Sequence, residues 1–308
     1  MITLVITGMH RSGTSLLASA VQQAGVDIGS ELNPATRGNL RGHFEDIEFL
    51  HFHERFMERR SVPVFSPAMD WTPSATPEEE AEARELVARQ AGKPLWGFKD
   101  PRTALFLDFW DPLLPAPFYV FLFRHPVEVV LSLMRRGLDS DVVRDPWNAV
   151  RAWTVYNSRL LAFHRSHPDR CVLWPLAGTA GDLEAALSAL GPRLGVRLST
   201  AGLNGLFQAE ELRLGLARTD LDWPAMMPEA LDLHQRLLAA ADRPAGGPAP
   251  SREQAAETEE LLLWQSLRAC AELQRKEEEW QRVGETRGWR LLQGYWSLSR
   301  RVRSRLRR

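Results

Sequence analysis

Cysteine is scarce in this chain, which limits how the protein can be stabilised. The 308 residues contain two cysteines, Cys171 and Cys270, far apart in the sequence. Two widely separated thiols exclude a disulfide framework and a structural zinc site built on cysteine. We interpret both as buried thiols of a protein that works in a reducing compartment.

Long apolar runs are missing too. None approaches the roughly 20 residues that span a bilayer. Strand-like residues begin at Leu4, so no signal-peptide pattern precedes them. With 44% hydrophobic and 25% charged residues, the composition is typical of a soluble globular protein, and we expect a cytoplasmic location.

Acidic residues are missing from the C-terminal tail. From Arg287 to Arg308 there are eight arginines and no aspartate or glutamate, although the formal net charge of the whole chain is -1. The rest of the chain is therefore acidic and the tail strongly basic. A net charge near zero gives no sign of a nucleic-acid partner, and we expect none.

A lysine is missing from the most informative motif. Residues 8–15, GMHRSGTS, follow a short apolar run and precede a helix-like stretch, which is the layout of a phosphate-binding loop. Thr14 occupies the lysine position of G-x-x-x-x-G-K-[ST]. The absence of this lysine disfavours phosphoryl transfer from a nucleoside triphosphate bound with magnesium. Backbone N–H groups, the hydroxyls of Ser12, Thr14 and Ser15, and the Arg11 guanidinium still suit an anion.

Short apolar runs alternate with helix-like segments. We expect strands at 4–7, 95–98, 119–123 and 171–174. We expect helices at 16–24 with Gly25 as the stop, at 47–56, after Thr76 in a capping box with Glu79, and at 182–190 with Gly191-Pro192 as the stop. This alternation predicts an α/β fold with a parallel sheet covered on both faces.

Charged residues directly follow three of these strands. The first strand leads into the 8–15 loop, the second into Lys99, Asp100 and Arg102, and the third into Arg124. Ligands of parallel sheets bind beyond the carboxyl ends of the strands, so these residues should share one crevice. An arginine ending a buried strand needs an anion. Ser132, eight residues after Arg124, reaches the same anion only if its helix packs beside the loop.

Two motifs together resemble those of a known family. R-S-G-T-S at 11–15 is similar to the 5′-phosphosulfate loop of sulfotransferases, and R-H-P-V-E-V-V-L-S at 124–132 looks like their 3′-phosphate motif. GMHRSGTS with a later KDPR resembles the bacterial and carbohydrate-type members. The resemblance covers roughly residues 1–200. It implies a P-loop-like three-layer fold and the sulfuryl donor 3′-phosphoadenosine 5′-phosphosulfate (PAPS).

The resemblance also implies roles for single residues. The family's catalytic cation falls at Arg11, and the donor would be held by Arg11, Ser12, Gly13, Thr14, Ser15, Arg124 and Ser132. A sulfuryl group carries less charge than a terminal phosphoryl group, so no metal is expected. The missing lysine fits such a loop.

Removal of the acceptor proton needs a base near the crevice. Members of the family commonly use a glutamate, and Glu45 occupies a similar place, while His43 competes because its ordinary pKa suits the task. Alternatively, Glu45 only favours the start of the next helix. Lys99 could stabilise charge on the leaving phosphate or the sulfonate, and Asp100 could orient Lys99, contact the acceptor or, in a nucleotide hydrolase, bind magnesium.

Other polar residues have simpler interpretations. Arg102 suits an ion pair at the sheet edge. His51 and His53 lie two apart with no third ligand at metal spacing, so we expect a solvated helix face there instead of a metal site.

Composition divides the chain into a catalytic domain at 1–242, a linker at 243–251, and a helical extension with a basic tail at 252–308. The extension should contain a long helix over 252–283, with Leu263, Leu267 and Cys270 in an apolar stripe. Aromatic residues beside unopposed arginines suit an anionic membrane surface. The tail could instead fold back on the acidic body or bind polyanions non-specifically.

The sequence thus predicts a sulfotransferase that moves a sulfuryl group from PAPS to an acceptor hydroxyl. A saccharide or glycolipid acceptor follows from family analogy alone. The alternatives are a P-loop-type nucleotide-dependent kinase and a non-catalytic nucleotide-binding scaffold.

Overall fold

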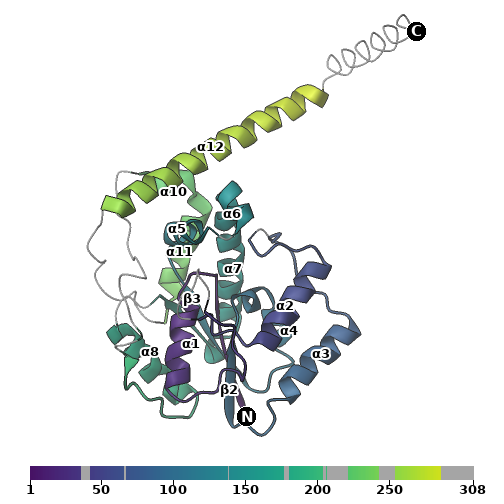
Figure 1. Cartoon of the computed structure of the whole chain (residues 1–308), viewed down its shortest axis with the longest axis vertical. Coiled ribbons are helices and arrows are strands. Elements are labelled where there is room, and N and C mark those ends of the chain that lie inside the picture. The colour runs from purple at the N-terminus through teal and green to yellow at the C-terminus, as the bar shows by residue number, and fades with distance from the viewer. Residues whose placement is uncertain are drawn as a thin grey trace, which may run out of the picture. The chain divides into compact units, whose positions relative to one another are not determined.

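The computed structural model describes residues 1–35, 42–65, 67–137, 139–176, 180–203, 206, 221–242 and 254–285. In this part of the chain, strands and helices alternate (Figure 1). The strands are β1 (Ile2–Gly8), β2 (Leu95–Lys99), β3 (Pro117–Phe123) and β4 (Cys171–Pro175). The longer helices are α1 (Thr14–Gln23), α2 (Ile47–Arg59), α3 (Pro77–Ala88), α5 (Pro126–Arg136), α7 (Trp147–Ser166), α8 (Ala180–Arg193), α11 (Pro228–Ala240) and α12 (Gln254–Glu285). Short helices are η1 (Pro101–Leu105), α4 (Leu107–Trp110), α6 (Ser140–Arg144), η2 (Pro168–Arg170) and α10 (Trp223–Met226).

The strands form one parallel sheet in the order β2-β1-β3-β4. β1 lies between β2 and β3, so that Ile6 pairs with Lys99 and Gly8 with Leu122. The chain leaves β1 toward β2 on one side and then crosses to β3 on the other. The carboxyl end of β1 is therefore a topological switch point, where ligands of open parallel sheets bind.

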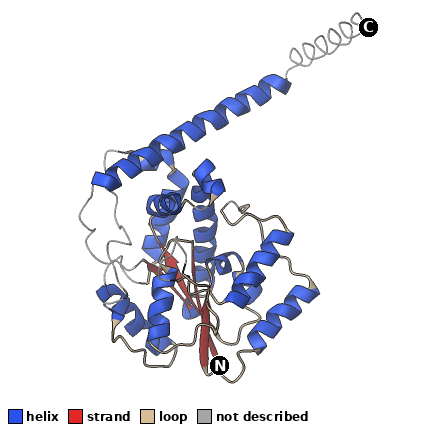
Figure 2. Ribbon diagram, in the orientation of Figure 1, coloured by secondary structure: helices blue, strands red, loops and turns tan. Residues whose placement is uncertain are grey.

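Helices cover both faces of the sheet, as Figure 2 shows. One face presents alternate strand residues such as Ile6 to α1 and α8. On the other face, the ring of Phe121 meets Phe163 of α7, and Phe98 stacks on Phe49 of α2 with 4.1 Å between ring centroids. The predicted three-layer α/β fold is confirmed.

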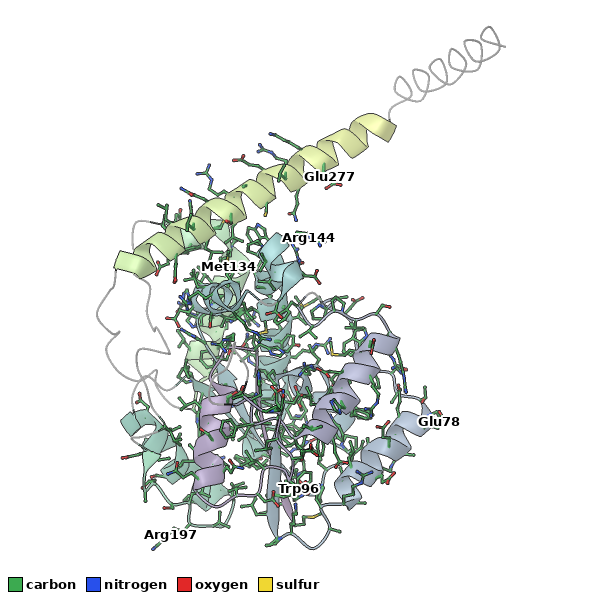
Figure 3. The ribbon with its side chains drawn as sticks, in the orientation of Figure 1. Glu78, Trp96, Met134, Arg144, Arg197 and Glu277 are labelled. Carbon is green, nitrogen blue, oxygen red and sulfur yellow. The ribbon has the colours of Figure 1, made fainter. Side chains whose placement is uncertain are left out.

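Aromatic side chains fill the layer between the sheet and α2. Figure 3 shows Trp96 of β2 inside the body of the fold, where it is 2% exposed, and Glu78 and Arg197 at the surface. The ring of Trp96 lies 5.9 Å from that of Phe49. Burying such large rings removes more apolar area from water than any other side chains would.

Local signals fix the start of α3 as the sequence predicts. Thr76 is the N-cap, its hydroxyl accepts from the backbone N–H of Glu79, and the Glu79 carboxylate accepts from the N–H of Thr76. Pro77 occupies the first helical position. This reciprocal capping box satisfies two backbone donors that the helix itself cannot pair.

The predicted stop of α8 at Gly191-Pro192 is wrong. The helix continues to Arg193, the N–H of Leu194 donates to the carbonyl of Leu190, and the left-handed residue is Gly195, with φ of 66°. A helix commonly ends where a residue adopts the left-handed conformation, whichever glycine comes first in the sequence. Pro192 falls in the last turn.

The chain divides into two compact units, Met1–Leu261 and Leu262–Arg308. The linker predicted at 243–251 and the basic tail at 288–308 lie outside the described residues. The long helix predicted over 252–283 is confirmed as α12, with Leu263 and Leu267 buried. Cys171 is buried as expected, but the prediction is wrong for Cys270 on α12, which is only half-buried. Among the described helices, none combines the length and apolarity needed to cross a bilayer.

The close approach of β1 and β3 at Gly8 yields a test of this packing. A Cβ on Gly8 would lie 2.2 Å from the carbonyl oxygen of Leu122. By propensity alone, Gly8→Ala should stabilise the strand by about 0.5–1 kcal/mol. Because the backbone of β3 blocks the methyl group, we expect the opposite sign, a loss of about 1–3 kcal/mol in the free energy of unfolding. Urea denaturation measures it, and a variant as stable as the wild type would contradict this packing.

Candidate active site

The loop after β1 is shaped to receive an anion. Arg11 and Gly13 adopt positive φ angles of 70° and 88°, and Gly13 is the N-cap of α1. No side chain of the described residues caps α1, and its first turn contains no acidic residue. The hydroxyl oxygen of Ser12 is buried and has no hydrogen-bond partner in the described part of the chain. A helix N-terminus with an uncommitted hydroxyl beside it suits an anionic group.

The two predicted donor motifs meet in space. The Nε–H of Arg11 donates to the hydroxyl of Ser132 on α5 at 2.9 Å, and Arg124 Nη1 lies 3.4 Å from the carbonyl oxygen of Arg11. The helix of Ser132 thus packs beside the loop, the condition on which its predicted role depends. Burial and the nearby charge of Arg124 lower the pKa of Arg11 to about 10. Arg11 therefore stays charged at neutral pH.

Arg124 is buried and follows β3 directly, and its carboxylate partner lies in the first turn of α5. Its Nε–H donates to Glu128 at 2.6 Å, and the Trp153 indole donates to its backbone carbonyl at 3.0 Å. Burial lowers the pKa of Arg124, and the charge of Glu128 opposes that change. The sequence analysis did not identify Glu128 as a partner of Arg124, because Arg124 precedes α5 and its direction is set by the fold.

A buried ion pair lies at the end of β2. Lys99 Nζ donates to Glu45 at 2.8 Å and to the backbone carbonyl of His43 at 2.9 Å, and the Lys99 and Glu45 side chains are 2% and 5% exposed. The Ser15 hydroxyl donates to the same His43 carbonyl at 3.1 Å. The loop after β1, the segment before α2 and the end of β2 are therefore linked, as the shared crevice predicts.

One contributor to this network was missed by sequence reasoning. The side-chain amide of Asn33 donates to Glu45 Oε2 at 3.0 Å, while Lys99 takes Oε1. Asn33 lies in a polar loop with no periodic pattern, so nothing in the sequence singles it out.

His43 is half-buried beside several cations. Burial lowers its pKa, as do Lys99, Arg136 and Arg11, and only Glu45 opposes them. At neutral pH the imidazole is therefore uncharged, the form in which histidine accepts a proton.

The prediction that His53 lies on a solvated face of α2 is wrong, because its ring is buried and hydrogen-bonded to Asp100. His53 Nδ1 and Asp100 lie 3.0 Å apart and both side chains are fully buried, whereas His51 is exposed. The Trp110 indole donates to His53 Nε2 at 2.8 Å. An indole can only donate a hydrogen bond, so Nε2 of His53 is the acceptor. Nδ1 of His53 therefore carries a proton and donates a hydrogen bond to Asp100.

Asp100 also holds Arg102. Asp100 accepts from the backbone N–H of Arg102 at 2.7 Å and from its guanidinium at 3.2 Å, and Arg102 reaches Glu54 at 2.9 Å. Burial would raise the pKa of Asp100, but Arg102 and His53 hold it below its usual range. Arg102 thus makes the predicted ion pair. The partner of the Lys99 ammonium is Glu45, and not Asp100 as one of the predictions had it. In the described ranges no group of three or more His, Cys, Asp or Glu side chains could hold a metal ion.

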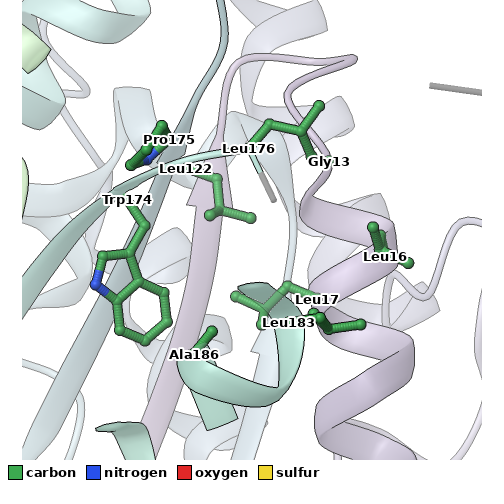
Figure 4. A pocket seen from close by; sticks show the side chains of 9 residues that line it. All are labelled: Gly13, Leu16, Leu17, Leu122, Trp174, Pro175, Leu176, Leu183 and Ala186. Carbon is green, nitrogen blue, oxygen red and sulfur yellow. The ribbon is translucent and has the colours of Figure 1, made fainter. Parts of the chain in front are cut away.

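An apolar cavity of about 20 Å³ lies against the loop at Gly13 (Figure 4). Figure 4 shows Trp174, Leu176 and Leu183 around it, with Leu176 directed toward Gly13. A space of this size holds about one water molecule, so it is a packing gap and too small for a substrate.

Comparison with protein families identifies the family of this chain. The model described as "Sulfotransferase family" matches residues 4–199. The chain belongs to the sulfotransferase family. The protein is accordingly a sulfotransferase, an enzyme that transfers a sulfuryl group. A comparison with curated proteins finds no match.

Solved structures of sulfotransferases are similar to this one. The sulfotransferase domain of the Synechococcus PCC 7002 olefin synthase is 20% identical, over 86% of this chain and 93% of that chain, with a TM-score of 0.43. The sulfotransferase domain from the curacin biosynthetic pathway is 16% identical, over 85% and 96%, with a TM-score of 0.42. Sulfotransferase STF9 from Mycobacterium avium is 13% identical, over 80% and 78%, with a TM-score of 0.49.

Proposed function

We propose that this sulfotransferase takes its sulfuryl group from PAPS and transfers it to a hydroxyl group of the acceptor. The observation that carries the proposal is the convergence of Arg11, Arg124 and Ser132 at the switch point of the sheet. Two arginines with a serine hydroxyl form a second anion site beside the phosphate loop. PAPS carries two separated anionic groups, the 5′-phosphosulfate and the 3′-phosphate, and so suits two sites.

Two groups of residues bind the two anionic groups of PAPS. Ser12, Gly13, Thr14 and Ser15 receive the 5′-phosphosulfate at the N-terminus of α1, where N–H groups favour negative charge. The Arg124 guanidinium and the Ser132 hydroxyl receive the 3′-phosphate, and Arg11 bridges the two sites. A guanidinium can direct two parallel hydrogen bonds to phosphate or sulfonate oxygens.

The transfer step is an in-line displacement at sulfur. The acceptor oxygen forms a bond to sulfur, and the bond from sulfur to the 5′-phosphate oxygen breaks, releasing adenosine 3′,5′-bisphosphate. The acceptor proton passes to Glu45, and Lys99 and Arg11 stabilise the negative charge that develops on the sulfonate and the leaving phosphate. His43, uncharged at neutral pH, is the competing base.

For the acceptor we propose a saccharide or glycolipid, by family analogy. Residues 286–308 lie outside the described part of the chain, and their sequence combines aromatic residues with arginines. We propose that this tail attaches a cytoplasmic enzyme reversibly to an anionic membrane surface, where a lipid-linked acceptor would be accessible.

Removing Arg124 tests the donor assignment. Arg124→Ala should lower the affinity for PAPS tenfold to a hundredfold, about 1.5–3 kcal/mol, because a charged hydrogen-bonding partner of the 3′-phosphate is lost. Adenosine 5′-phosphosulfate, which lacks the 3′-phosphate, should bind nearly as before. Isothermal titration calorimetry measures both, and equal losses for the two nucleotides would overturn the role of Arg124.

That experiment needs a control for Glu128, because Arg124→Ala removes the guanidinium that pairs with its buried carboxylate. The double variant Arg124→Ala with Glu128→Ala removes both charges and should show the same selective loss. Arg151→Ala, which removes an exposed arginine paired with Asp145, should leave both affinities unchanged.

Separate substitutions of Glu45 and His43 distinguish the two bases. Glu45→Gln should keep donor binding and lower turnover by about 10²–10⁴-fold, the usual contribution of a general base. His43→Ala should have the smaller effect. Transfer of ³⁵S from labelled PAPS to a saccharide panel measures turnover, and the reverse order would assign the base to His43. The same assay tests whether a metal is needed. Sulfuryl transfer should continue in the presence of EDTA, because the proposed mechanism uses no metal ion. A strict requirement for magnesium would favour a kinase.

Truncation tests the membrane proposal. The full chain should co-sediment with anionic phosphatidylserine vesicles at low salt, and binding should weaken as salt rises, because each basic residue near the surface contributes about 1 kcal/mol. A chain ending at Val283 should stay in the supernatant. If the full chain ignores the vesicles at low salt, the membrane proposal fails.

A further inference from the structure

Asn33 is held against the segment that carries both candidate bases. Its backbone N–H donates to the carbonyl of Glu45 at 2.7 Å, and its carbonyl accepts from the N–H of His43 at 3.2 Å. Beside it, Leu32 and Asp46 form an antiparallel bridge. These bonds involve backbone atoms only, so a change of the Asn33 side chain leaves them intact.

The side chain of Asn33 completes the environment of the Glu45 carboxylate. Its amide donates to Oε2 at 3.0 Å, while Lys99 donates to Oε1 at 2.8 Å. Each carboxylate oxygen therefore has a donor, one neutral and one charged. The carboxylate is buried, so both bonds lie where hydrogen bonds to charge are strong.

We propose that Asn33 is a positioning residue for the transfer reaction, one that orients the Glu45 carboxylate. The proposal rests on the proposed function of Glu45 as the base. It follows the general arrangement in which a third group orients the catalytic base.

The two donors on Glu45 differ in what they do during transfer. In the proposed step Lys99 also stabilises the charge that develops on the sulfonate and the leaving phosphate, so its ammonium is shared between that charge and Oε1. Asn33 carries no charge and has no such second target, so it keeps the carboxylate aimed while the acceptor proton arrives.

Asn33→Asp is the sharpest test, because it changes charge with little change in shape. Two carboxylates in hydrogen-bonding reach of each other share a proton. The acid limb of the pH profile of kcat should therefore move upward by about one pH unit or more, with activity regained at higher pH. Asn33→Ala should lower kcat about tenfold, and Asn33→Ser should recover part of that loss.

The assay measures transfer of ³⁵S from PAPS to the best acceptor of a saccharide panel, across pH, with the full chain. Affinity for adenosine 3′,5′-bisphosphate and the thermal unfolding midpoint should remain close to wild type in the Asn33 variants. The matched control is Asn148→Asp, because Asn148 also donates through its side-chain amide, there to the Asp141 carbonyl at 3.1 Å. Its pH profile should superimpose on that of the wild type.

The outcomes separate this inference from the function beneath it. If the wild type transfers sulfuryl groups and the Asn33→Asp profile shifts and recovers at high pH, Asn33 acts through the base. If the wild type transfers and all Asn33 variants keep the wild-type profile and kcat, the positioning role is refuted while the proposed function stands. If the wild type neither binds the bisphosphate nor transfers, the proposed function fails and the inference falls with it.

Discussion

The position of β1 between β2 and β3 is the constraint on which the site depends. Parallel pairing on both sides brings the ends of three strands to one edge, with Ile6 beside Lys99 and Gly8 beside Leu122. The loop that follows Gly8 therefore lies between Lys99 on one side and Arg124 on the other. Residues distant in sequence become neighbours because the register leaves their strands no other arrangement.

Buried charge at this edge is the second constraint. Arg124 is partnered by Glu128, and Lys99 by Glu45, in surroundings that exclude most water. Removing one member of such a pair costs more than the pair contributes, because the remaining charge stays buried. Arg11 donates to the neutral hydroxyl of Ser132, while burial and the charge of Arg124 lower its pKa. In the proposed site, a donor with two anionic groups would lie among these cations.

The sequence predicts most of what depends on local pattern. The alternation of apolar runs with helix signals was enough for the parallel sheet, and Thr76 with Glu79 for the start of α3. Arg124 and Ser132 were found by resemblance to a family motif, with Arg124 directly after β3 and Ser132 on α5. Gly195 ends α8 instead of Gly191, since two nearby glycines look alike until the backbone angles are known.

Contacts that depend on tertiary packing escaped prediction. His53 was predicted to be solvated because its partner, Asp100, lies 47 positions away in the sequence. Asn33 likewise meets Glu45 only because the polar loop folds back along the segment before α2. Asn33 lies in a segment without periodicity. His53, in contrast, lies on the buried side of α2 with Phe49 and Phe56, so helical spacing could have placed it there, although only the fold reveals its partner.

Calorimetry of the wild-type protein with adenosine 3′,5′-bisphosphate, beside ATP with magnesium, tests the central claim most directly. The account predicts that the bisphosphate binds in the presence of EDTA, because its two phosphates match the loop after β1 and the site of Arg124 and Ser132. It also predicts weaker binding of ATP, whose triphosphate lacks a loop lysine and whose ribose lacks a 3′-phosphate. Tight, magnesium-dependent binding of ATP with no binding of the bisphosphate would contradict it.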